Sequence, residues 1–110
     1  MIEEIVLDYL NYNLEVLVAL EKPDKEPEEY VLIEKTGSSY ENFINTATIV
    51  LQSYSTSLHK AAQLNEEVKT AMNKIIELND ISKSQLNSDY NYTDTTKKKY
   101  RYQAVYDLFY

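Results

Sequence analysis

The stretch NSDYNYTDTTKKKYRYQAVYDLFY, residues 87–110, carries the strongest fold signal in the sequence. It holds six of the 11 tyrosines of the chain, which are Tyr90, Tyr92, Tyr100, Tyr102, Tyr106 and Tyr110. They recur at a spacing of two on both sides of a polar segment, and two residues is the repeat of a β-strand. The pattern predicts a long β-hairpin with arms near residues 81–92 and 100–110, in which tyrosines line one face of each arm.

The segment before this hairpin has a helical repeat instead. Residues 58–78 carry one apolar stripe at helical spacing, and lysines and glutamates fill the opposite side. Ser55, Thr56 and Ser57 are candidates for the N-cap, and Asn79 follows the last helical residue. The expected buried stripe consists of Ala61, Leu64, Val68, Ala71, Met72, Ile75 and Leu78.

Three strands are predicted further upstream. Residues 14–21 alternate, residues 30–35 form a short β-branched run, and residues 43–54 form a long one. The first strand should turn Leu14, Val16, Val18 and Leu20 to one face, and the third should turn Phe43, Ala47, Ile49 and Leu51 inward.

Prolines, charged residues and the single glycine mark the connections between these elements. Residues 22–29 contain both prolines and many charges, so we expect an exposed loop. Thr36, Gly37, Ser38 and Ser39 include the only glycine and are predicted to form a turn. Residues 1–12 have helical spacing and acidic residues near their start, which favours a short helix.

These elements predict a single α+β domain over residues 1–110. The order is α-β-β-β-α-β-β, with a mainly antiparallel or mixed sheet covered by one long helix and a short N-terminal helix. No apolar run approaches the roughly 20 residues that a membrane span needs, and the acidic start is unlike a signal peptide. We therefore expect a soluble intracellular product.

Charge is distributed unevenly along the chain. Residues 1–36 hold ten acidic residues and three lysines, whereas residues 37–110 hold eight acidic and eight basic residues. The net charge of −7 argues against tight binding of nucleic acid, because that affinity comes mainly from neutralising phosphates. The acidity could also serve only to keep the protein soluble.

The sequence offers little material for catalysis. It has no cysteine, which excludes thiolate nucleophiles, disulfides and cysteine–zinc sites. His59 is the only histidine and is expected on the helix surface. Adjacent carboxylates such as Glu66 and Glu67 do not face one point on a helix, and a phosphate loop needs more than one glycine. We expect no enzyme activity, no catalytic or metal site and no cofactor.

The hairpin tip alternates basic and aromatic residues over residues 97–102. Three interpretations are open: contact with the acidic third of a neighbouring subunit, a solvated tip that protects an exposed edge, or binding of single-stranded nucleic acid. Because the whole chain carries a net charge of −7, subunit contact ranks first, the solvated tip second and nucleic acid last. The predicted interface residues are Tyr90, Tyr92, Lys97, Lys98, Lys99, Tyr100, Arg101 and Tyr102.

The whole chain resembles the small tail-terminator, or tail-completion, proteins of long-tailed bacteriophages and prophages. The resemblance rests on LEVLVALEKPDKEPEEYVLIEKTGSS after an N-terminal helix, on ATIVLQSYS leading into SLHKAAQLNEEVKTAMNKII, and on LNSDYNYTDTTKKKYRY before the closing YRYQAVYDLFY. It is a likeness of order, length and texture, with short shared runs such as the pair Arg101 and Tyr102.

The resemblance implies a structural virion protein. Such proteins form a hexameric ring that caps the finished tail tube, ends tube polymerisation and offers a docking face to the head-side connector. Their location is the virion tail, and the host cytoplasm during assembly. DNA passes through the lumen without specific binding. The uneven charge of this chain adds a separate hypothesis, that Asp24, Glu26, Glu28 and Glu29 form an acidic lumen surface along which DNA slides. Alternatives are another head–tail joining protein, such as an adaptor or stopper, and a small dimeric regulatory module.

Overall fold

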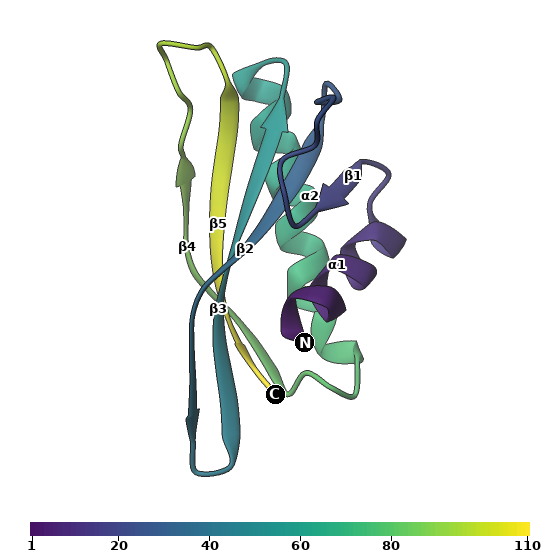
Figure 1. Ribbon diagram of the computed structural model, residues 1–110, viewed down its shortest axis with the longest axis vertical. Helices are drawn as coiled ribbons and strands as arrows, with labels where there is room; N and C mark the ends of the chain where they lie inside the picture. The colour runs from purple at the N-terminus through teal and green to yellow at the C-terminus, as the bar shows by residue number, and fades with distance from the viewer.

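The computed structural model describes all 110 residues as two α-helices, a short 3-10 helix and one five-stranded sheet (Figure 1). The sheet order is β1-β2-β3-β5-β4; β1 runs parallel to β2, and every other pair of neighbours is antiparallel. Both helices lie against the same face of the sheet, which leaves an open face opposite. The α+β class and the expected element order are confirmed. The elements are α1 (Ile2–Asn13), β1 (Leu17–Ala19), β2 (Tyr30–Glu41), β3 (Ile44–Ser55), α2 (Leu58–Lys74), η1 (Ile75–Glu77), β4 (Lys83–Asn91) and β5 (Tyr100–Phe109).

Helix α2 forms the centre of the helical layer, as its stripe predicts. Ser57 is the N-cap, and its hydroxyl accepts a hydrogen bond from the Lys60 amide at 3.2 Å. The predicted stripe is buried except for Leu78, which is half-buried. It packs against alternate residues of β3 and β5, namely Ala47, Ile49, Leu51, Ala104, Tyr106 and Leu108. Neither helix is long and apolar enough to cross a membrane.

The first strand is shorter than predicted. Only Leu17–Ala19 pair with β2, although the alternating pattern runs from residue 14 to residue 21. Val18 is buried, whereas Leu20 is exposed, because a strand needs a partner edge as well as an alternating pattern. Asn11 of α1 holds the entry to β1 through its side chain, which both donates to and accepts from the backbone of Val18.

The predicted turn over residues 36–39 is wrong. These residues continue β2, and Gly37 has no positive φ; it follows a bulge between Lys35 and Gly37. The chain reverses instead at Asn42 and Phe43, whose φ angles are 53° and 66°. A type I′ hairpin turn has positive φ at both central positions, and asparagine tolerates this geometry. The prediction that Phe43 points inward is therefore also wrong.

The tyrosines do line one face of each arm of the second hairpin, but the two faces are opposite. Tyr90 and Tyr92 of this hairpin lie on the open face and are 41% and 45% exposed. Tyr106 lies on the helical side and is fully buried, while Tyr100 and Tyr102 are half-buried. The same two-residue repeat of tyrosines thus places some of them in the core and others on the surface.

Candidate functional site

The tip of the β2–β3 hairpin exposes an aromatic side chain in a strained conformation. Phe43 is 91% exposed and sits at a φ of 66°, a region that bulky residues rarely adopt. Tyr40 and Ile44 beside it are 64% and 48% exposed. Figure 1 shows this hairpin extending beyond the end of the helical layer. Strain and exposed apolar area together mark a segment suited to contact with a partner.

The open face of the sheet carries a second group of aromatic residues. Tyr30 and Tyr54 stack with their ring centres 4.6 Å apart and their planes 9° apart. Arg101 of β5 donates to the Tyr54 hydroxyl at 2.8 Å and to the Tyr92 carbonyl at 2.7 Å. Its guanidinium carbon lies 4.3 Å from the centre of the Tyr92 ring, within cation–π range. Arg101 therefore joins β5 to β3 and to the end of β4.

Amide side chains continue this network across the sheet. Gln103 donates to the Tyr90 hydroxyl at 2.6 Å and accepts from the Gln52 amide at 3.1 Å. Gln52 in turn accepts from the Tyr54 hydroxyl at 3.1 Å. Of the predicted interface residues, the structure gathers Tyr90, Tyr92 and Arg101 here. The two glutamines were not predicted, because only cross-strand register reveals that they meet.

The basic tip folds onto the acidic loop of the same chain. Lys99 lies 3.3 Å from Glu26, which also pairs with Lys22 at 2.9 Å. The hydrogen bond from Lys22, reinforced by that from Lys99, holds the pKa of the Glu26 carboxyl below its usual range. Lys97 and Lys98 stay exposed without an ion pair.

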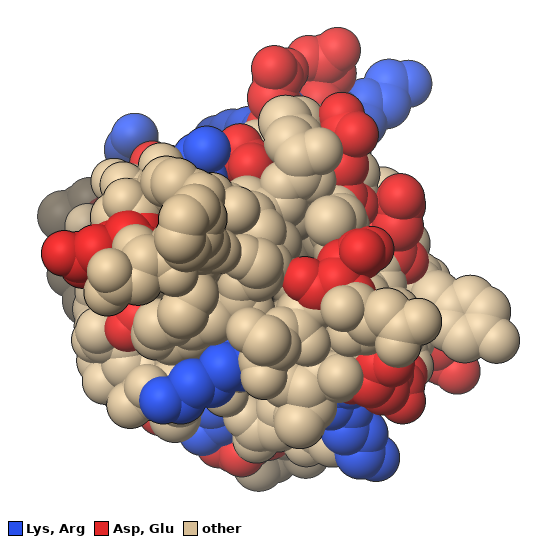
Figure 2. Space-filling model, turned by 90° about the horizontal axis from the view of Figure 1, so that it is seen from below, with Lys and Arg blue, Asp and Glu red and all other residues tan.

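The predicted acidic surface is consequently divided. Asp24 and Glu28 are exposed, and neither forms an ion pair, whereas Glu29 accepts a hydrogen bond from the Ser55 hydroxyl at 2.9 Å. Tyr30 is buried close to Glu26; burial, with the nearby carboxylate, raises the pKa of its phenol to about 12. Seen from the end that carries the β2–β3 hairpin, acidic side chains are more numerous on one side, and basic side chains are scattered around the face (Figure 2).

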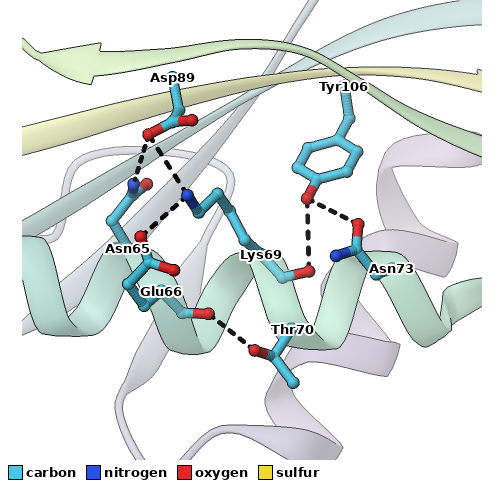
Figure 3. A network of polar contacts seen from close by, with 7 residues as sticks. All are labelled: Asn65, Glu66, Lys69, Thr70, Asn73, Asp89 and Tyr106. Atoms are coloured by element: carbon cyan, nitrogen blue, oxygen red, sulfur yellow. Dashed lines mark hydrogen bonds and ion pairs between the residues drawn. The ribbon is translucent and has the colours of Figure 1, made fainter.

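On the helical side, a polar network ties β4 to α2 (Figure 3). Lys69 lies 2.9 Å from Glu66 and 3.4 Å from Asp89, and Asn65 donates to the same Asp89 oxygen at 3.4 Å. The hydrogen bond to Glu66, reinforced by the nearby Asp89 carboxylate, raises the pKa of the Lys69 amine. These contacts hold β4 against α2.

Two surface grooves indent the helical side of the molecule. One, of about 550 Å³, lies between the end of α1 and α2 and includes Glu15, Glu67 and Lys74. The other, of about 390 Å³, is lined mainly by apolar side chains of α1 and by Leu78. His59 lines neither groove and is exposed on α2. No group of three or more acidic or histidine side chains is placed to hold a metal ion.

The exposed features of the molecule are thus suited to recognition by shape and contact. They are the strained aromatic tip of one hairpin and the exposed Tyr90 and Tyr92 of the tyrosine–arginine network. No protein-family model matches the sequence, and no curated protein matches it.

Proposed function

We propose that this chain is a structural protein of a bacteriophage tail that caps the tail tube as a ring. In this role it ends the addition of tube subunits and offers its other side to the head-side connector. The observation that carries the proposal is Phe43, an almost fully exposed aromatic residue in a left-handed turn at the end of an extended hairpin. The resemblance of the whole chain to tail-terminator proteins, in the order and character of its segments, indicates the tail tube as the partner.

The physical reason is that an apolar residue at such a position does little for the isolated subunit. Glycine would fit the turn with less strain, and a polar residue would be better solvated. Tyr40 and Ile44 enlarge the apolar area at the same end. Such an end is suited to contact with another protein, which would remove this area from water.

Charge supports a passive role toward DNA. The chain carries a net charge of −7, and Asp24 and Glu28 keep unpaired carboxylates on the exposed loop. If this loop lines the lumen, it repels the phosphate backbone, and DNA slides past without being held. Localisation of Asp24 and Glu28 on the outer wall of an imaged ring would remove this part of the proposal.

The first test is native mass spectrometry over a range of concentrations, with negative-stain imaging of the same sample. Six-subunit rings with an open centre are expected, either for the chain alone or at the ends of purified tail tubes. A dimer at every concentration, with no binding to tubes, would refute tube capping and favour the regulatory alternative.

A second test separates tube capping from the other head–tail joining roles. The chain is added to tail-tube subunits of the same phage while they polymerise, and tube length is measured by electron microscopy. Shorter tubes that stop growing at the end bearing the protein are expected. Binding to the head connector without any effect on tube growth would identify an adaptor or stopper instead.

A further inference from the structure

The sheet has two edges with free backbone groups. On one side, β1 pairs with β2 only at Tyr30–Leu32, so the outer edge of β2 beyond Leu32 has no partner. On the other side, β4 pairs only with β5, so the whole outer edge of β4 is free. Unpaired edges of this kind are ready sites for pairing with another strand.

The free edges of β2 and β4 lie at the same position along the strand direction. Cross-strand partners form continuous rows, and the row that begins at Gly37 passes through β3 and β5 and ends at Gln85. The next rows join Ser38 to Ser84 and Ser39 to Lys83 in the same way. A neighbouring copy therefore needs no shift along the strands to bring its β2 edge beside β4.

The strand directions also agree. From β2 to β4 the sheet passes through three antiparallel steps, so β2 and β4 run in opposite directions. A second copy, rotated about an axis roughly along the strands, would set its β2 antiparallel to β4. Head-to-tail contacts of this type close into a ring when the operation has no translation along its axis.

We propose that residues 37–39 of β2 in one copy pair antiparallel with residues 83–85 of β4 in the next copy, with Gly37 opposite Gln85 and Ser39 opposite Lys83. This inference rests on the proposed ring and names the contact that builds it. Each strand has a bulge at the same end of the paired segment: one lies between Lys35 and Gly37, the other between Leu86 and Ser88. On the side of the bulges that carries the proposed contact, both strands pair regularly with their inner neighbours.

The side chains along the two edges suit close approach. The β2 segment consists of Gly37, Ser38 and Ser39, which are small, and an added Cβ at Gly37 would meet open space. Lys83, in the row of Ser39, would have Glu41 of the next copy as its diagonal neighbour on the same face. Diagonal pairs of long, oppositely charged side chains attract across antiparallel strands. The contact is therefore complementary in charge as well as in direction.

Disulfide trapping tests this register directly, since the chain has no cysteine of its own. Gly37→Cys and Gln85→Cys are combined in one chain, where two intervening strands hold the positions roughly 14 Å apart, too far for an internal bond. In the proposed contact their Cα atoms lie at roughly 4.5–5.5 Å, a distance that a disulfide spans. Mild oxidation, alone and on tail tubes, is expected to give a ladder that ends at the closed ring on a non-reducing gel.

Matched variants make the result specific. Each single cysteine should stay uncross-linked, and Gly37→Cys with Ser88→Cys should react much more slowly because the two positions lie in different rows. Lys83→Glu should lower the ring fraction, and adding Glu41→Lys should restore it. Cross-linking by Gln85→Cys alone would indicate β4–β4 pairing and overturn the inference.

The outcomes separate this contact from the function. If mass spectrometry shows six-subunit rings of the Gly37→Cys, Gln85→Cys variant but oxidation forms no disulfide between subunits, the edge pairing is overturned and tube capping stays in place. A chain that stays monomeric in solution and forms no ring on tubes would overturn both the edge pairing and tube capping.

Discussion

Replacement of Phe43 by glycine should separate the stability of the subunit from its assembly. Phe43 lies at a φ of 66°, and a left-handed conformation disfavours a residue with a Cβ by about 1–2 kcal/mol. Glycine relieves that strain, and Asn-Gly is the preferred pair for a hairpin turn with two positive φ angles. The substitution thus improves the local fit while it removes the whole aromatic side chain.

The opposing contributions are small because the side chain is 91% exposed. At about 25 cal/mol per Å² of buried apolar surface, the remaining contact contributes about 0.5 kcal/mol or less. The greater freedom of glycine in the unfolded chain costs about 0.5–1 kcal/mol. The free energy of unfolding should therefore be unchanged or rise by about 0.5 kcal/mol.

Phe43→Ala is the matched control, because alanine loses the ring but keeps the Cβ. It should be less stable than Phe43→Gly by about 1 kcal/mol, the reverse of the order expected at an ordinary strand position. Urea unfolding followed by far-ultraviolet circular dichroism, at a concentration where the chain is monomeric, measures both values. Both variants should lose tube capping.

Two results would refute this reasoning. If the alanine variant is as stable as the glycine variant, the turn at Asn42 and Phe43 does not have the left-handed geometry described above. If both variants assemble and cap tubes like the unmodified chain, Phe43 is no partner contact, and the proposed function loses the observation that carries it.

Three further predictions concern the network and the core. Arg101→Lys keeps the charge but loses the fork that reaches two acceptors, so urea unfolding should show a loss of about 1 kcal/mol; an unchanged midpoint would mean that these two hydrogen bonds do not stabilise the fold. Tyr106→Phe removes hydroxyl bonds to Lys69 and Asn73 and should cost about 1 kcal/mol, against about 3–5 kcal/mol for Tyr106→Ala by the same assay. The pKa of Tyr9 and of Tyr30 is raised to about 12, mainly by burial, so both phenols are neutral in the folded protein. The free energy of unfolding should therefore be full below pH 10 and decline as pH rises toward 12. Tyrosinate absorbance should increase together with the loss of circular dichroism. Phenols that ionise fully by about pH 11 in the folded protein would contradict that burial.

The long helix and the tyrosine hairpin were predictable because their signals are local. Ser57 caps a helix whose stripe repeats along its own axis, and each arm of the hairpin alternates with a period of two. Neither signal needs information from distant residues, so element type and order follow from the sequence.

Tertiary structure decided the turn, the length of the first strand and the site. Gly37 is compatible with a turn, yet pairing with β3 keeps residues 36–39 extended and moves the reversal to Asn42 and Phe43. Residues 14–21 alternate, but only three of them find a partner edge.

The contacts of the candidate site depend on register between strands that are distant in sequence. Gln52 meets Gln103, and Lys99 meets Glu26, across separations of 51 and 73 residues. The sequence by itself determined which segments become helices and strands and how their charge is distributed. Only the assembled sheet decided which side chains meet, which tyrosines are buried and which edges stay free, because these depend on pairing between segments that carry no local record of one another.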